Sequence, residues 1–454
     1  MGAASPPGPN GMPVVGSTPR FLSDQLRFLT SCREAYGDIT SFNLGPDSAY
    51  LLSHPKEIEQ ILVTDADTYR KPNFSSPLGE VIGDGLLLHE GGEAWWERRR
   101  RSQPAYSMRK FMEEQQIGAA KTYTKDLIDN WEAGEPVTIQ EDMVRVAIRV
   151  IADALFGIRF SENTVDTVAQ QLEPLGTEFE PDIARAVLPD WVPTPTSREF
   201  QGAHANLRSF MSEIVQERRH ELAGGTHDDT ASGPPTDVLS IMVRATQNEE
   251  IDDELLIQEL LTVLLAGTDT TALALTYTWY LLAQHPDVED KLHEEVDSVL
   301  DGSPPTADDL QELEYTERVL SEAMRLYPPV YLMVREPQEP VELAGYQIPS
   351  GSTVMLSQWT VHRDPRWYDD PETFDPDRWT NERTNERPKH SYFPFGAGPR
   401  QCIGKPVARP EMKLVLSTIA QHYRLENPQP NSLEFNPVVT LHPADRIKLT
   451  ARTR

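Results

Sequence analysis

The residues best suited to chemistry form one short segment near the C-terminus. Residues 395–404 read F-G-A-G-P-R-Q-C-I-G and place a single cysteine, Cys402, between Gly398 and Gly404. Glycine permits tight turns and close approaches that a Cβ would prevent. A thiolate in such a loop can accept backbone N–H bonds and is stabilised by the start of a following helix. A lone cysteine is more often a small buried hydrophobe, but this density of specified residue types favours a sulfur that approaches a large planar cofactor.

The same ten residues fit the pattern F-x-x-G-x-R-x-C-x-G, which resembles the haem-binding loop of the cytochrome P-450 monooxygenases. We therefore interpret Cys402 as the axial thiolate ligand of a haem iron. Arg400 is expected to neutralise a carboxylate on the rim of the cofactor. The resemblance implies haem b as the cofactor, and the residues of the loop that it assigns to cofactor binding are Phe395, Gly398, Arg400 and Gly404.

A second unusual segment lies inside the longest apolar helical pattern, from about Asp252 to Ala283. In a helix interior Gly267 costs about 1 kcal/mol relative to alanine, and Asp269 and Thr270 compete with the helix through their own hydrogen bonds. Such departures from local rules are often functional. The run A-G-T-D-T resembles the oxygen-binding groove of the same family. There, Ala266 and Gly267 leave room for dioxygen, Thr270 hydrogen-bonds the oxygen and Asp269 relays protons. The alternative is a back-bonded structural pair.

A third motif is E-x-x-R, formed by Glu322 and Arg325. A spacing of three places both charges on one helix face, where they can pair. The motif precedes two prolines that should end the helix. By resemblance to the family, Arg378 supplies a second arginine to the glutamate, and Glu322, Arg325 and Arg378 form a structural network under the cysteine loop.

The resemblance also assigns residues to the periphery of the cofactor. Trp95 and Arg99 fit the pattern W-x-x-x-R and are candidates to hold a haem propionate. Arg335 and His362 align with positions that often face the cofactor. A single histidine, however, is also commonly a satisfied core residue.

The resemblance spans about Pro6 to Leu449 and implies one large unit. We expect a Pro/Gly-rich N-terminal segment over residues 1–18 and a single cytochrome P-450 haem domain over residues 19–454. The expected fold is mainly α with a small β-rich lobe, with haem between the helices that the family names I and L. Pro410 lies in the expected start of the L helix, where it should kink or delay the helix.

Three segments have strand-like patterns, and two are polar and irregular. The strand-like segments are 40–52, 341–356 and 438–450, and the irregular ones are 222–237 and 381–390.

The net charge of −29 makes nucleic acid an improbable partner, because the field of the protein repels phosphate. An acid-rich, lysine-poor surface resembles proteins of a high-salt cytoplasm, which suggests a soluble, halophilic, haloarchaeal-type member of the family. The alternative is an ordinary acidic cytosolic protein. With Cys402 on iron, Cys32 has no disulfide partner, which fits a reducing cytoplasm. The Pro/Gly-rich start contains no apolar stretch of anchor length, so no membrane anchor is expected.

The family implies insertion of one oxygen atom from O2 into a lipophilic organic substrate, because the aligned pocket segments are mainly apolar. The donor is expected to be a separate ferredoxin-type protein that docks on a basic patch. Two alternatives remain: a peroxygenase or isomerase that needs no electron donor, and a non-catalytic haem sensor. The aligned pocket walls are 74–88, 179–195, Leu265, Ala266, Thr270, 330–334, Val438 and Val439. The predicted patch comprises Arg98, Arg100, Arg101, Arg109, Lys110, Lys405, Arg409 and Lys413.

Overall fold

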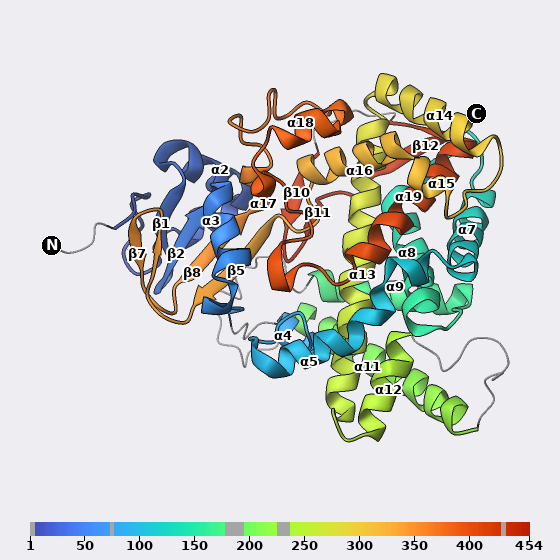
Figure 1. Cartoon of the computed structure of the whole chain (residues 1–454), viewed down its shortest axis with the longest axis horizontal. Helices are drawn as coiled ribbons and strands as arrows, with labels where there is room; N and C mark the ends of the chain where they lie inside the picture. The colour runs from blue at the N-terminus through green and yellow to red at the C-terminus, as the bar shows by residue number, and fades with distance from the viewer. Residues whose placement is uncertain (1–4, 73–76, 178–194, 225–236, 428–432) are drawn as a thin grey trace.

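A helix-rich body and a smaller β-rich lobe make up the molecule (Figure 1). The lobe lies at the N-terminal end and also takes strands from the segment around residues 332–357. This architecture is the mainly α fold with a small β lobe that the sequence predicts. The structure is a computed structural model, and it describes residues 5–72, 77–177, 195–224, 237–427 and 433–454.

Five strands form the sheet of the lobe in the order β1-β2-β8-β5-β3. Strands β2 and β8 run parallel, and the other neighbours are antiparallel. Because successive side chains of a strand point to opposite faces, Val354 and Leu356 enter one apolar cluster and Met355 enters another. Both faces of the sheet are therefore covered. The strands are β1 (Ile39–Leu44), β2 (Asp47–Leu52), β3 (Tyr69–Arg70), β5 (Leu332–Pro337) and β8 (Thr353–Ser357).

Helix α13 (Asp253–Leu282) runs through the middle of the body (Figure 1). The Asp252 side chain caps it by accepting a hydrogen bond from the Leu255 N–H at 2.8 Å. The predicted helix from Asp252 to Ala283 is thus confirmed. Among the described helices only α13 is long and apolar enough to cross a membrane, but 67% of that stretch is buried inside the protein. Its apolar side chains form the core of the body.

Two further helices position the predicted site. Helix α16 (Glu314–Leu326) carries the E-x-x-R motif and ends immediately before Tyr327 and Pro328. Helix α19 (Lys405–His422) begins directly after the cysteine loop and packs against α13 and α16. The predicted delay by Pro410 is wrong, because α19 already begins at Lys405. Pro406 is tolerated in the first turn, since a backbone N–H at that position would have no partner within the helix. Pro410 lies inside the helix and removes only the bond to the Pro406 carbonyl.

The strand-like segments each contain strands, whereas the irregular segments are partly helical. Helix α11 (Pro195–Gly224) extends into the predicted 222–237 connector, of which residues 225–236 lie outside the described part. A short helix, α18 (Asn381–Asn385), occupies half of the other irregular segment. In the N-terminal segment, the Pro6 and Pro7 carbonyls accept hydrogen bonds from Ser41 at 2.6 and 2.9 Å. Residues 6–7 are thereby fastened to the first strand of the lobe.

The remaining elements surround these parts. The other helices are α1 (Thr18–Ser23), α2 (Gln25–Tyr36), α3 (Pro55–Glu59), α4 (Pro77–Ile82), α5 (Gly92–Ser102), α6 (Met108–Phe111), α7 (Glu114–Asp129), α8 (Ile139–Phe156), α9 (Glu162–Thr177), α12 (Val238–Gln247), α14 (Pro286–Leu300), α15 (Asp309–Glu312) and α17 (Gln358–Val361). The small sheets contain β4 (Pro136–Thr138), β12 (Lys448–Thr453) and β9 (Tyr423–Glu426); β6 (Val341–Leu343) and β7 (Tyr346–Ile348); and β10 (Phe435–Pro437) and β11 (Leu441–Pro443).

Candidate active site

Cys402 occupies the loop that leads into α19. Its backbone N–H donates a hydrogen bond to the Phe395 carbonyl at 2.9 Å, which closes the loop. Burial raises the pKa of the Cys402 thiol, while the backbone N–H groups of Gly404 and Lys405 and the charge of Arg99 oppose the rise. The side chain is solvent-accessible although burial dominates its pKa. The sulfur is therefore accessible while lying among densely packed protein groups. A metal ion bound there would deprotonate the thiol.

The glycines of the cysteine loop have structural reasons that differ from the prediction. Gly398 has φ +65°, and a Cβ there would lie 1.9 Å from the Leu62 carbonyl oxygen. It therefore permits close contact with a neighbouring backbone, and its approach to a cofactor ring stays a prediction. Gly396, which the sequence interpretation overlooked, has φ +67° and adjoins the Met333 side chain. Gly404 has an ordinary φ of −79°, and a Cβ there would lie 3.8 Å from the Cys402 sulfur.

Four cationic side chains meet beside the cysteine loop: Lys71, Arg99, Arg335 and Arg400. The charge of Arg400 lowers the pKa of Lys71 and Arg335, and that of Arg99 lowers the pKa of Arg400. Burial is the largest cause in each case and brings the pKa of Arg335 to about 10. Asp67 is the one carboxylate whose charge acts appreciably on Arg400. None of the four forms an ion pair with a carboxylate in the part of the chain that the structure describes.

The ring of Trp95 contacts two of these cations. Its indole N–H donates to the Leu86 carbonyl at 3.1 Å, so this donor is already engaged. The Arg99 and Arg400 guanidinium carbons lie 5.4 and 4.5 Å from the centroid of the ring, within range of cation–π attraction. Arg99 also donates to the Gln401 carbonyl at 2.6 Å. These ring contacts give Trp95 a supporting role for the two arginines, and its contact with a propionate stays a prediction.

Helix α13 presents a small residue to solvent in the middle of the core. Ala266 is exposed, and its helix neighbours Leu265, Gly267 and Thr270 are half-buried. Gly267 has a different neighbour, because a Cβ there would lie 2.8 Å from Cδ1 of Ile151 in α8. The Thr270 hydroxyl donates to the Ala266 carbonyl at 2.8 Å. Gly267 thus allows α8 to pack closely, and Ala266 is the exposed small residue of this stretch.

Asp269 is bound by the C-terminal hairpin. Its Oδ2 accepts a hydrogen bond from the Thr440 hydroxyl at 2.6 Å, and its Oδ1 lies 3.3 Å from Nε2 of His442. Burial raises the pKa of the Asp269 carboxyl, but the charge and hydrogen bond of His442 and the bond from Thr440 outweigh burial, and the pKa is lowered. Asp269 is consequently an ionised group at neutral pH.

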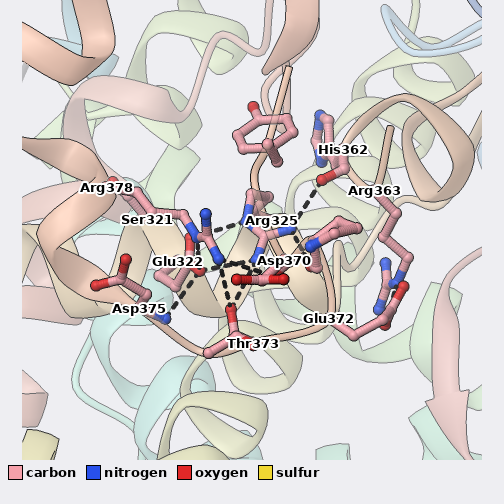
Figure 2. A network of polar contacts seen from close by, with 12 residues as sticks. Ser321, Glu322, Arg325, His362, Arg363, Asp370, Glu372, Thr373, Asp375 and Arg378 are labelled. Carbon is pink, nitrogen blue, oxygen red and sulfur yellow. Dashed lines mark hydrogen bonds and ion pairs between the residues drawn. The ribbon is translucent and has the colours of Figure 1, made fainter. Parts of the chain in front are cut away.

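The E-x-x-R motif and Arg378 form one buried network (Figure 2). Arg325 binds both oxygens of Glu322 at 2.8 Å, and the Arg378 Nε donates to Oε1 at 3.1 Å. The Trp379 indole and the Asp375 backbone N–H complete the shell of the carboxylate at 2.9 and 3.0 Å. Glu322 and Arg325 are both 0% exposed.

The remaining donors of Arg325 connect this network to the chain ahead of the cysteine loop. They bind the backbone carbonyls of His362 at 2.9 Å, Pro371 at 2.6 Å and Thr373 at 3.1 Å (Figure 2). The structure therefore brings the three predicted network residues together and attaches them to residues 362–378.

His362 and Arg335 lie in different surroundings. His362 is fully buried, and its Nε2 accepts a hydrogen bond from the Phe393 N–H at 3.0 Å. Burial and the charges of two neighbouring arginines hold the pKa of His362 well below its usual value. The cofactor-facing prediction for His362 is wrong: it is a neutral core residue that supports the segment before Cys402. Arg335, by contrast, belongs to the unpaired cations beside the loop.

The predicted basic patch is largely neutralised. Arg98 pairs with Asp84 and Arg101 with Glu250, at 3.0 and 2.6 Å, and Arg409 pairs with Glu317. Burial takes two further cations out of the patch: the ammonium groups of Lys110 and Lys413. Among the described residues, the members that are neither paired with a carboxylate nor buried at the charged group are Arg100, Arg109 and Lys405.

The predicted pocket walls are only partly described. Residues 73–76 and 178–194, which hold much of two predicted walls, lie outside the described residues. Leu265 is half-buried on α13, and Val439 at the tip of the β10–β11 hairpin is 41% exposed. These apolar side chains lie on the same elements as Ala266 and Thr440.

Three polar residues of the site were missed by the sequence interpretation: Lys71, Thr440 and His442. For Lys71 there was only a weak indication in the sequence, namely that lysine is scarce in this chain. Thr440 and His442 had none, since their partner Asp269 is far away in sequence.

The residues present fit a haem group with two propionates. The converging cations lack a carboxylate partner among the described residues, and bound anionic groups would offset the repulsion between these like charges. The Cys402 sulfur adjoins them and accepts backbone N–H bonds at the start of α19. An iron porphyrin needs these two features: a thiolate ligand and cations for its carboxylates.

Comparison with known proteins agrees with this geometry. The family model described as cytochrome P-450 matches residues 6–450. The chain is 33% identical over 421 residues to cyclooctat-9-en-7-ol 5-monooxygenase of Streptomyces melanosporofaciens, covering 92% of this chain and 88% of that protein. It is 32% identical over 457 residues to pentalenene oxygenase of Streptomyces avermitilis, covering 98% and 97%.

A plant protein, LUTEIN DEFICIENT 5 of Arabidopsis thaliana, is 29% identical over 92% of this chain and 72% of its own length. These sources give the haloarchaeal interpretation no support. With the family model spanning almost the whole sequence, the chain belongs to the cytochrome P-450 family and is a monooxygenase.

Proposed function

We propose that this enzyme inserts one oxygen atom of O2 into a C–H or C=C bond of a cyclic terpenoid, using haem b held by Cys402. The observation that carries the proposal is the Cys402 sulfur beside four cations without a carboxylate partner among the described residues. For hydroxylation the balance is RH + O2 + 2 electrons + 2 protons → ROH + H2O. Haem, when bound, would supply the activation of dioxygen.

The residues of the chain divide the remaining tasks. The Cys402 thiolate would hold the haem iron and would supply the electron-rich ligand that oxygen activation needs. Lys71, Arg99, Arg335 and Arg400 hold the two carboxylates of the cofactor. Asp269 carries protons, and Thr270 presents a hydroxyl beside the exposed surface of Ala266.

The substrate class rests on the apolar wall and on the relatives. Leu265, Val438 and Val439 offer hydrocarbon surface next to Ala266 and Thr440. The names of two relatives specify a cyclooctatenol and pentalenene as substrates, which are cyclic and largely hydrocarbon. A cyclic terpenoid would bury its carbon skeleton on such a surface, at about 25 cal/mol per Å2 of apolar area.

Replacing Thr270 with alanine tests oxygen activation from O2. We expect reductant consumption to continue while product per electron pair falls by about tenfold or more, because protons reach the oxygen less efficiently. Thr276→Ala is the matched control, since its buried hydroxyl makes the same bond to the carbonyl four residues earlier, at 2.7 Å. A peroxide-driven enzyme would keep its product yield in the Thr270→Ala variant, which would contradict the proposal.

The electron donor is proposed to be an acidic ferredoxin-type protein. Arg100 and Arg109 are exposed and lie near the exposed apolar side chains of Trp96 and Met108. Lys405 lies at the start of α19, which packs against α6, the helix of Arg109. This smaller patch replaces the predicted one. Charge complementarity would speed the encounter with an acidic donor.

The charge reversal Arg100→Glu with Arg109→Glu should slow reduction by an acidic ferredoxin by about tenfold at low ionic strength. Added salt should erase the difference, because it screens exposed charges. The control is Arg27→Glu, on an exposed site of α2 in the β-rich lobe. Equal reduction rates for the patch and control variants at low salt would refute the docking site. Substrate-induced spectra of the patch variant that match those of the wild type would exclude a general folding defect.

The acid surplus supports adaptation of a soluble, cytoplasmic enzyme to high salt. With a net charge of −29, repulsion between carboxylates destabilises the compact state, and salt screens this repulsion. The thermal midpoint of unfolding should therefore rise between low and molar KCl. A higher midpoint in low salt would contradict the proposal.

A further inference from the structure

The C-terminal hairpin β10–β11 is fastened to the middle of α13. The Tyr277 hydroxyl of α13 donates to the Leu441 carbonyl of β11 at 2.5 Å. Two turns earlier on the same helix, Asp269 meets Thr440 and His442. The hairpin thus contacts α13 through the Leu441 carbonyl and through the side chains of the residues before and after Leu441.

The register of the strand explains why both oxygens of Asp269 are bound. Side chains two residues apart lie on the same face of a strand. Thr440 and His442 flank Leu441 in this way, so one reaches Oδ2 at 2.6 Å and the other Oδ1 at 3.3 Å. Neither residue belongs to a sequence motif, and the contact spans more than 170 positions of the chain.

The Asp269 carboxylate has one charged neighbour among the described residues, His442. Within the described residues, His442 is the one charged group whose field acts appreciably on Asp269. Tyr277 is the other titratable group nearby. Burial and the charge of Asp269 raise the pKa of Tyr277 well above its usual value, so it stays neutral. Thr440 supplies only a neutral hydroxyl.

Burial alone would raise the pKa of Asp269. It is the largest influence on the pKa of this carboxyl and acts upward, whereas the net shift is downward because His442 and Thr440 oppose it. The hairpin therefore decides the protonation state of an acid that lies next to Thr270 in α13.

We propose that His442 is a positioning residue of the proton path, which holds Asp269 ionised and oriented through Oδ1 while Thr440 fixes Oδ2. This inference rests on the proposed role of Asp269 as the proton carrier. It extends the acid–alcohol pair of α13 by a third member from β11, adjacent to the hairpin tip that carries the apolar Val439.

The first test is infrared spectroscopy of the resting, haem-loaded enzyme as a function of pH. Between pH 5 and 8, His442→Ala should show a protonated-carboxyl C=O band at low pH that is absent from the wild type. The same band should be missing from the double variant His442→Ala/Asp269→Asn, which assigns it to Asp269. His442→Gln retains an N–H donor without the charge, and its band should be weaker at each pH. An ionised Asp269 throughout this range in His442→Ala would overturn the proposal.

The second test is the amount of product formed per electron pair. His442→Ala should lower this ratio by about threefold to tenfold, and His442→Gln should lower it less. At the other contact, Thr440→Ser should lower the ratio less than Thr440→Val. A purely structural role would instead raise the KM and leave the ratio unchanged, which would refute the proposal. If Asp269→Asn lowers the ratio and His442→Ala does not, this inference fails alone. If Asp269→Asn leaves the ratio intact, the proposed role of Asp269 fails first.

Discussion

Cys402→Ser is expected to remove the red-shifted Soret band that thiolate-ligated haem gives in the reduced, carbon monoxide-bound protein, and to reduce oxygenation below detection. A serine hydroxyl remains protonated and is a poor ligand for iron, so the electron push of the thiolate is lost. The measurement is the difference spectrum of dithionite-reduced protein with and without carbon monoxide. It is followed by product analysis.

The chain provides its own control for this experiment. Cys32 is the other cysteine, 3% exposed in α2, and burial raises the pKa of its thiol to about 11. Cys32→Ala should retain the thiolate-type band. The ligand assignment would be wrong if that band survived in Cys402→Ser or vanished in Cys32→Ala.

Glu322→Gln should lower the free energy of unfolding by about 3–5 kcal/mol, because it leaves two buried guanidinium groups without their charge partner. Both Arg325 and Arg378 bind this carboxylate, and together they hold the backbone of residues 362–373. Typical domains have about 5–15 kcal/mol of stability, so a large share would be lost. Urea unfolding, with haem content measured in parallel, gives the result.

The matched control lies on the same helix. Glu314 pairs with Arg318 at 3.5 Å, and its side chain is 76% exposed. An exposed pair contributes about 0–1 kcal/mol, so Glu314→Gln should hardly change stability. Equal unfolding free energies for the two variants would mean that the Glu322 network is not structural. Arg378→Lys should be intermediate, since lysine keeps the charge and loses the bidentate geometry.

Local features of the sequence were sufficient where the physics is local. The bounds of α13 followed from an acidic N-cap and an apolar helical pattern, and both act within one or two helical turns. The Glu322–Arg325 pair followed from a spacing of three on one helix. The cysteine loop was recognisable because its residue types are all needed within ten positions.

Contacts between distant segments were not predictable in the same way. Gly398 is required by the Leu62 carbonyl and Gly267 by Ile151, and in each case the partner lies on another element. The indole of Trp95 and the ring of His362 are satisfied by Leu86 and Phe393. A motif names such a residue, but only packing decides which atom meets its donor or acceptor.

By itself, then, the sequence determined the family, the central helix and the buried Glu322 network, and it predicted the thiolate ligand, because these depend on residue type and short spacing. The tertiary structure alone decided the electrostatics. It paired three residues of the predicted basic patch with carboxylates, gathered Lys71 with three arginines, and joined Asp269 to His442. Electrostatic interactions depend on distance in space and on burial, and neither quantity can be read from positions along a chain.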